Sequence, residues 1–300
     1  MGKEGNPDIL RTLVGGPPFL QKTAIVAGAT GAIGRATCAA LLQRGATVIG
    51  LGRDQARLKT LQRDLAQLGD GFTPVQMSGL SEGRWGDTIQ RVLTLQSPID
   101  LFVHAIGILI PGAVLELREP EIRTIVATNL LSVVSAARAI APHMIACGSG
   151  HFVAVASLGG LIPMPYQALY SATKFGVRGF CLSLHEELRP HGVCVSMVSP
   201  GPVSSPMLEA ERTDSRASLA SVGRPADPER VAEDIIRVIR FPRREIVNPG
   251  VHRFTGAIVN AFPDLFGFIF PGLQRLGRRR LRMFVPRHRD ARGVNHGFLS

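Results

Sequence analysis

The sequence has few of the features that mark disulfide-stapled or membrane-spanning proteins. Only four of its 300 residues are cysteine, and no two of them form a CxxC pair. A disulfide framework is therefore not expected, nor is a metal site. No run of about 18 apolar residues occurs, which argues against a transmembrane helix. Acidic residues and prolines occupy the N-terminus in place of the apolar part of a signal peptide. We therefore expect a cytoplasmic protein.

Acidic residues are also scarce, and their shortage is uneven along the chain. The chain has 23 Asp and Glu against 34 Lys and Arg, a net charge of +11. Residues 275–292 alone carry eight arginines and one aspartate, a net charge of +7. The rest is close to ordinary in charge, so specific binding of nucleic acid is not expected. With 45% hydrophobic residues, the chain can form a substantial core.

Short apolar segments alternate with amphipathic segments from about residue 22 to residue 200. The apolar segments are predicted strands, at 23–27, 47–51, 99–105, 150–157 and 193–199, with a weaker one at 73–77. The segments between them have a helical period, at 33–44, 54–68, 81–96, 119–147 and 169–189. This alternation predicts an α/β domain with one doubly wound parallel sheet.

The pattern changes beyond residue 200. Residues 202–226 show no clear period, and we expect an irregular functional loop there. A helix over 227–240, with Asp227 as its N-cap, and a last strand at 245–247 follow. The chain is thus divided into an N-terminal arm (1–21), a main domain (22–250) and a C-terminal extension (251–300).

The C-terminal extension is rich in phenylalanine over residues 254–273, and arginines follow at once. Pro263, Asp264 and Pro271 break this stretch, so one uninterrupted spanning helix is not expected. Two interpretations stay open. The extension contacts an anionic membrane surface, or its phenylalanines pack on the body as a lid or a subunit interface.

Three glycines follow the first predicted strand, where a helix begins. Gly28 allows a tight turn, Gly31 lets a ligand approach the backbone, and Gly34 lets helix and strand pack closely. Thr30 and Ile33 belong to the same turn. Free N–H groups and the positive end of a helix bind pyrophosphate, so the turn predicts a dinucleotide site.

The end of the second predicted strand bears on the choice of cofactor. An acid about 20 residues past the glycines would bind the ribose 2′-hydroxyl of NAD, but Gly52 stands there and Arg53 follows. A guanidinium suits a 2′-phosphate. NADP(H) is therefore the predicted cofactor, with NAD(H) as the alternative. Asp54 is interpreted as the N-cap of the next helix.

Four polar residues are candidates for catalysis. Tyr170 and Lys174 are four residues apart, which places both on one face of a helix. A nearby ammonium favours phenolate, so the pair can exchange a proton with an alcohol or alkoxide. Ser157 follows a predicted strand, and its hydroxyl can polarise a carbonyl oxygen. Asn129 lies in an apolar helical stretch, where it must be hydrogen-bonded.

In their order, these features resemble the short-chain dehydrogenase/reductase family over residues 22–205. The resemblance rests on the glycines, Asn129, Ser157, Tyr170-x-x-x-Lys174, and two further motifs, His104-Ala105-Ile106-Gly107 and Pro200-Gly201. It implies a Rossmann-type fold, an NAD(P)(H)-dependent oxidoreductase acting on an alcohol/carbonyl pair, and a homodimer or homotetramer. The sequence departs from the family's common pattern at two positions. Ala32 stands where the family usually has a glycine, and His104 stands where it usually has an asparagine.

The resemblance also implies roles for single residues. Tyr170 is the acid/base, Lys174 lowers its pKa and holds the nicotinamide ribose, Ser157 orients the substrate oxygen, and Asn129 supports a water relay. Further cofactor contacts are implied at Ala105, Gly107, Pro200, Gly201, Val203 and Ser205. The loop 202–226, with Met207, Leu208 and Leu219, predicts an apolar small-molecule substrate. The rival hypotheses are a nucleotide-binding regulatory protein with little turnover and a protein that binds nucleic acid through its tail.

Overall fold

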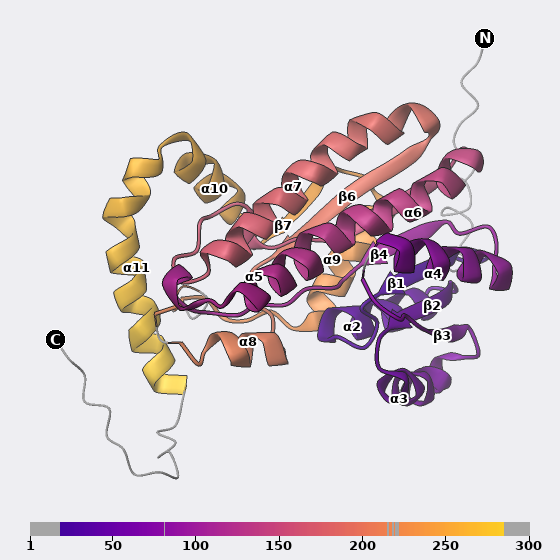
Figure 1. Ribbon diagram of the computed structural model, residues 1–300, viewed down its shortest axis with the longest axis horizontal. Coiled ribbons are helices and arrows are strands. Elements are labelled where there is room, and N and C mark those ends of the chain that lie inside the picture. Colours follow the sequence, from indigo (N-terminus) through magenta and orange to yellow (C-terminus); the bar gives the residue numbers. More distant parts are fainter. Residues whose placement is uncertain (1–18, 81, 215, 218, 220–221, 285–300) are drawn as a thin grey trace.

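The fold is built on one parallel sheet of seven strands. The computed structural model describes residues 19–284 except 81, 215, 218, 220 and 221, and Figure 1 shows its layers. The strand order is β3-β2-β1-β4-β5-β6-β7. The strands are β1 (Thr23–Ala27), β2 (Thr47–Gly52), β3 (Phe72–Gln76), β4 (Leu101–His104), β5 (Gly150–Val155), β6 (Val193–Pro200) and β7 (Glu245–Asn248). The predicted doubly wound parallel sheet is confirmed, and its order reverses between β1 and β4.

Helices cover both faces of this sheet. One face carries α2 (Ala32–Leu42), α3 (Gln55–Leu65) and α9 (Pro228–Arg240). The other carries α4 (Glu82–Leu95), α6 (Ser132–Ala146) and α7 (Ala168–Leu188). The five strands β1, β2, β4, β5 and β6 are almost fully buried between these helices, which explains why they read as continuous apolar runs. Short helices η1 (Ala66–Leu68), η2 (Val114–Glu116), η4 (Leu158–Gly160) and η5 (Arg189–His191) join these elements.

The long helix predicted at 119–147 is interrupted. It consists of α5 (Glu119–Val126), a π-helical segment η3 (Ala127–Leu131) and α6. By length and composition Glu119–Ala146 is apolar enough to cross a membrane. Its residues Val133, Ala136 and Ile140 are buried against the sheet, as in the core helix of a globular domain. A π-helical turn is often found at a functional site, and this one holds Asn129.

The loop predicted to be irregular at 202–226 contains a helix, α8 (Pro206–Glu211). The prediction was wrong there because the local capping signals are strong. The side chain of Ser205 accepts a hydrogen bond from the N–H of Leu208, and Pro206 takes the first helical position. The predicted N-caps Asp54 and Asp227 are confirmed in position, but only the side chain of Asp54 makes a capping hydrogen bond.

The C-terminal extension folds into α10 (His252–Ala261) and α11 (Pro263–Phe284). The expected break at Pro263 is confirmed, since α11 begins there. The expected break at Pro271 was wrong, because this proline lies inside α11, where packing of the helix on the body outweighs one lost hydrogen bond. The predicted N-terminal arm up to residue 18 and Arg287, Arg289 and Arg292 lie outside the described residues.

Candidate active site

The predicted site residues meet at one edge of the sheet. β2, β1, β4, β5 and β6 are consecutive neighbours in the sheet, and all strands are parallel. Their carboxyl ends therefore lie side by side. The segments that follow them carry Arg53, the glycine turn 28–34, Gly107, Ser157 and Pro200-Gly201 in that spatial order. Ligands of open α/β sheets bind at this edge, next to the point where the strand order reverses.

The glycine turn has the shape of a phosphate cradle. Gly28 has a φ of +81°, and a Cβ there would lie 2.8 Å from the carbonyl oxygen of Ala105. A Cβ on Gly34 would lie 2.1 Å from the carbonyl oxygen of Gly28. Gly31 is the N-cap of α2, with no side-chain cap and no acidic residue in the first turn. The first-turn N–H groups thus face no competing carboxylate, and these residues fit a pyrophosphate.

Two arginines follow β2, and the sequence analysis singled out one of them. The Arg53 side chain is exposed, while its carbonyl oxygen accepts a hydrogen bond of 3.0 Å from Gln76 Nε2. Arg57 Nη2 donates to the carbonyl oxygen of Thr30 over 2.9 Å, so this second guanidinium lies beside the phosphate cradle. Asp54 accepts from the N–H of Arg57, which occupies it as a helix cap. The sequence signal that could have identified Arg57 as a second candidate for binding the cofactor is its position in the first turn of the helix after β2.

Tyr170, Lys174 and Ser157 are brought together between α7 and the end of β5. Tyr170 and Lys174 are 8% and 4% exposed. Lys174 Nζ donates to the carbonyl oxygen of Val155 over 3.2 Å and lies 5.8 Å from the centre of the Tyr170 ring. Gly159 lies beside both Tyr170 and Ser157. A Cβ on this glycine would lie 3.1 Å from Tyr170 Cε1 and 3.6 Å from Ser157 Oγ. The absence of that Cβ lets the two hydroxyl-bearing side chains share one space.

Burial is the largest influence on the pKa values of Tyr170 and Lys174. Burial raises the pKa of Tyr170 to about 12, a hydrogen bond from Ser157 lowers it, and the charge of Glu211 raises it. Burial also lowers the pKa of Lys174 to about 8. Burial of the phenol thus outweighs the hydrogen bond that lowers its pKa, and the lowering of the Tyr170 pKa by Lys174 stays a prediction.

Asn129 is buried and fully hydrogen-bonded, as predicted. Its Oδ1 accepts from the N–H of Ile108 over 2.8 Å, and its Nδ2 donates to the carbonyl oxygen of Ile108 over 2.9 Å and to Thr173 Oγ1 over 3.3 Å. A Cβ on Gly107 would lie 3.6 Å from Asn129 Oδ1 and 3.5 Å from Lys174 Nζ. Asn129 thus fixes the loop after β4 against the helix that carries Tyr170 and Lys174.

His104 is the last residue of β4. It is fully buried, and its Nε2 lies 3.1 Å from Ser132 Oγ. Burial, followed by the charge of Lys174, lowers its pKa to about 3. The imidazole is therefore neutral at physiological pH.

A buried carboxylate was missed by the sequence analysis. Glu211, in α8, is 8% exposed and accepts a hydrogen bond from Nε2 of Gln167. Burial raises the pKa of Glu211 to about 7. In the same helix, Met207 Cε lies 4.0 Å from the position of a Cβ on Gly107. The segment 202–226 therefore reaches the site, whereas the hydroxyl of Ser205 is engaged in capping α8.

Comparisons with known proteins agree with this geometry. The family model described as short chain dehydrogenase matches residues 22–216. An uncharacterized oxidoreductase of Staphylococcus haemolyticus is 30% identical over 227 residues, 76% of this chain and 94% of that protein. The 3-oxoacyl-acyl-carrier-protein reductase of Vibrio harveyi is 29% identical over 218 residues, 72% of this chain and 88% of that protein.

A solved structure gives the same result in three dimensions. A variant of actinorhodin polyketide ketoreductase with NADPH is similar with a TM-score of 0.70 and 28% identity, covering 75% of this chain and 95% of that chain. The family match spans more than half of the chain, and the fold and the order of the motifs agree with it. The chain is therefore an NAD(P)-dependent oxidoreductase that belongs to the short-chain dehydrogenase/reductase family.

Proposed function

We propose that this protein is an NADP(H)-dependent oxidoreductase that interconverts an apolar ketone or aldehyde and the corresponding alcohol. The observation that carries the proposal is the grouping of Ser157, Tyr170 and Lys174 at the carboxyl end of β5, beside an uncapped helix N-terminus that fits a pyrophosphate. The bound nicotinamide would donate or accept the hydride. The protein's own residues would handle the proton and orient the substrate.

Each catalytic side chain has a task that follows from its position. Ser157 Oγ would donate a hydrogen bond to the substrate oxygen, which polarises a carbonyl. The Tyr170 hydroxyl would give its proton to the developing alkoxide, or take one from an alcohol in the reverse direction. Lys174 would hold the ribose and favour the phenolate. Asn129, anchored to Ile108, would keep the loop after β4 in register with these groups and support the water relay.

The choice of NADP(H) over NAD(H) rests on the end of β2. Gly52 offers no carboxylate there, Asp54 is engaged as a helix cap, and Arg53 and Arg57 are both exposed. Two guanidinium groups would bind a 2′-phosphate. The ketoreductase solved with NADPH supports this choice. The backbone contacts at Ala105, Gly107, Pro200, Gly201 and Val203 remain part of the proposal.

Substrate, assembly and location are the finer parts of the proposal. The helix α8 brings Met207 to the site, and the neighbouring Leu208 is buried. These two side chains support an apolar substrate. The reductase and ketoreductase relatives support a carbonyl group in that substrate. We place the protein in the cytoplasm as a homodimer or homotetramer. Contact of residues 251–300 with a membrane is argued below.

An NADPH-consumption assay over a panel of ketones and aldehydes tests the proposal. We expect oxidation of NADPH with at least one apolar carbonyl compound, abolished in Tyr170→Phe. A protein that binds NADPH tightly but consumes none with any substrate would support the alternative, a nucleotide-binding regulatory protein. Stronger activity with NADH than with NADPH would support the NAD(H)-dependent alternative.

A further inference from the structure

The C-terminal arm, defined as α10 and α11, is fixed to the body along one face. Asn260 Nδ2 donates to the carbonyl oxygen of Leu161 over 2.7 Å, and Gly256 and Val259 are buried. Gln274 Nε2 donates to the carbonyl oxygen of Arg216 over 3.3 Å. In the same helix, Arg280 donates to the carbonyl oxygen of Val222. The arm is therefore a docked part of the fold, with a defined inner and outer side.

The other sides of the arm expose large aromatic side chains. Phe254, Phe262 and Phe268 are 73%, 65% and 84% exposed, and Ile258 is 50% exposed. Phe254 and Ile258 are four residues apart in α10, which places them on one side of that helix, and Phe262 ends it. Of the two interpretations of the phenylalanine-rich stretch, packing on the body agrees with the partial burial of Phe266 and Phe270, whose rings lie 5.5 Å apart within α11. It leaves the three exposed phenylalanines without a role.

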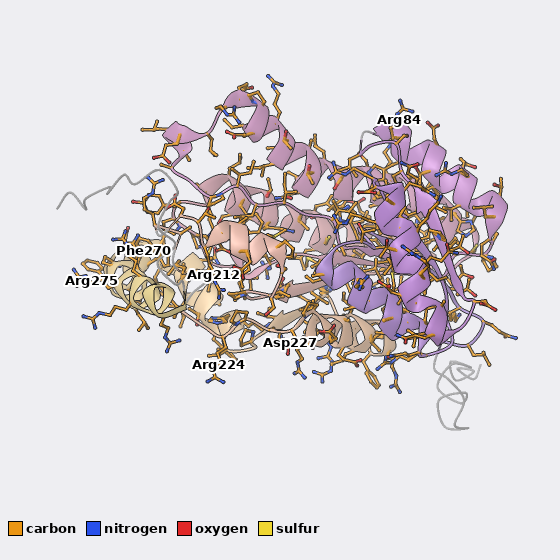
Figure 2. All side chains as sticks on the ribbon, turned by 90° about the horizontal axis from the view of Figure 1, so that it is seen from below. Arg84, Arg212, Arg224, Asp227, Phe270 and Arg275 are labelled. Carbon is orange, nitrogen blue, oxygen red and sulfur yellow. The ribbon has the colours of Figure 1, made fainter. Side chains whose placement is uncertain are left out.

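The same surface is strongly basic. Within residues 252–284 there are six arginines and one acidic residue, Asp264. Arg253, Arg275, Arg278 and Arg279 are exposed, and none of their side chains pairs with a carboxylate among the residues that the structure describes. Figure 2 shows Arg275 and Phe270 on α11 at one end of the molecule, far from Arg84 at the other end. Among the described residues, guanidinium groups without a carboxylate partner thus lie on the same two helices as the exposed phenylalanines, at one end of the protein.

We propose that the C-terminal arm docks on an anionic phospholipid surface. Arginine forms paired hydrogen bonds with phosphate, and exposed aromatic rings enter the boundary between headgroups and acyl chains. A nucleic acid would use the arginines but leave the phenylalanines in water. A second copy of this chain would bring equal positive charge to the interface, which disfavours self-association through this face. The combination of positive charge and exposed aromatic rings therefore favours an anionic membrane as the partner of the arm.

Docking there would place the active site next to the lipid. The inner side of the arm holds Leu161, four residues past Ser157, and the loop carbonyls of Arg216 and Val222. In Figure 2, Arg212 and Arg224 of this loop lie beside α11. The segment that covers the substrate is thus adjacent to the membrane-facing arm. On the proposed function, a lipophilic carbonyl substrate would enter from the bilayer.

Vesicle sedimentation of the full-length chain tests this proposal without any catalytic readout, so its failure is distinguishable from failure of the proposed function. We expect the protein to sediment with vesicles of phosphatidylcholine and phosphatidylglycerol, but not with phosphatidylcholine alone. Rising salt should release it, because exposed charges are screened. Equal behaviour toward both vesicle types overturns the proposal.

Matched triple variants assign the binding to the arm. Replacing Arg275, Arg278 and Arg279 with glutamine should lower the partition onto anionic vesicles about 100-fold, since each arginine near the surface contributes about fivefold. The control replaces exposed arginines away from the arm, Arg84, Arg230 and Arg240, by glutamine and removes the same charge. If the control variant loses as much binding as the arm variant, net charge alone explains the binding and the proposal is wrong.

A second pair of variants tests the exposed rings. Substitution of Phe254, Phe262 and Phe268 by serine should also release the protein from anionic vesicles, with an unchanged melting temperature, because these side chains pack on little of the body. Its control replaces other exposed apolar residues, Leu20→Ser, Leu95→Ser and Phe241→Ser. Retained vesicle binding in the phenylalanine variant would overturn the proposal that the rings enter the membrane. A change in oligomer size on light scattering, instead of a loss of vesicle binding, would reassign this face to a second copy.

Discussion

The side-chain amide of Gln167 donates a hydrogen bond to the carboxylate of Glu211, 44 residues further along the chain, and both side chains are buried. Gln167 is the N-cap residue of α7, three residues before Tyr170. Glu211 ends α8 in the segment that covers the site. The substrate segment and the catalytic helix are therefore joined by a buried hydrogen bond to a group that can ionise.

The first prediction concerns stability. Burial raises the pKa of Glu211 to about 7 from its usual 4.5, so the folded state binds a proton more tightly than the unfolded state. The free energy of unfolding should then fall by up to about 3 kcal/mol as pH rises from the unfolded pKa through the folded one. Glu211→Gln should raise the melting temperature at pH above 7, with little gain at pH below 4.5.

Thermal melts of wild type, Glu211→Gln and the control Glu209→Gln measure this difference. Glu209 is in the same helix but is exposed, so its replacement should not change the pH dependence. An equal gain for Glu211→Gln at both pH values would show that the carboxylate is not desolvated.

The second prediction concerns the pH profile of catalysis. The negative charge of Glu211 raises the pKa of Tyr170, so removal of that charge should lower it. Alcohol oxidation needs the phenolate, and its rate rises with pH as the phenol ionises. In Glu211→Gln the rising limb of kcat/KM against pH should therefore move to lower pH. A limb that stays in place would mean that Glu211 only positions α8.

The third prediction concerns the acid/base residue. Tyr170→Phe keeps the ring and removes the proton, so turnover should fall by the ~10²–10⁴ typical of a lost general acid/base. NADPH binding should survive, because Tyr170 is proposed to contact the substrate. Tyr166→Phe, the other tyrosine of the chain, is the matched control and should stay active. Near-normal turnover of Tyr170→Phe would refute the mechanism.

Lys174→Ala gives a contrast with this variant. Because Lys174 is proposed to hold the ribose and to favour the phenolate, both turnover and cofactor affinity should fall. A loss of turnover with unchanged NADPH affinity would confine its role to the proton transfer.

The fourth prediction concerns the cofactor. A hydrogen bond to a charged group contributes about 1.5–3 kcal/mol, roughly 10- to 150-fold in affinity. Arg53→Ala should therefore erase most of the preference for NADPH and leave NADH binding little changed, and Arg57→Ala should act in the same direction. Fluorescence titration measures both affinities. Arg63→Ala, an exposed arginine further along α3, is the control, and a wild type that prefers NADH would contradict the prediction.

Local sequence patterns were enough for the parts of the site that depend on neighbours along the chain. The glycines after β1, the four-residue spacing of Tyr170 and Lys174, and the cap at Asp54 each act within one or two turns of backbone. Parallel strands also place their carboxyl ends at one edge, so the meeting of these motifs follows from the predicted strand–helix alternation.

Tertiary structure decided what depends on burial and on partners distant in sequence. The hydrogen-bond partners of Asn129, Ile108 and Thr173, lie 21 and 44 residues away in the sequence. Glu211, whose charge adds to the effect of burial in raising the pKa of Tyr170, lies 41 residues from it. Pro271 lies inside a helix because α11 packs on the body. The sequence by itself determined the family fold and its reactive groups. Tertiary structure alone decided the protonation of these reactive groups, the Gln167–Glu211 contact and the side of the arm that faces outward. The physical reason is that long-range packing removes water from some side chains and leaves it on others.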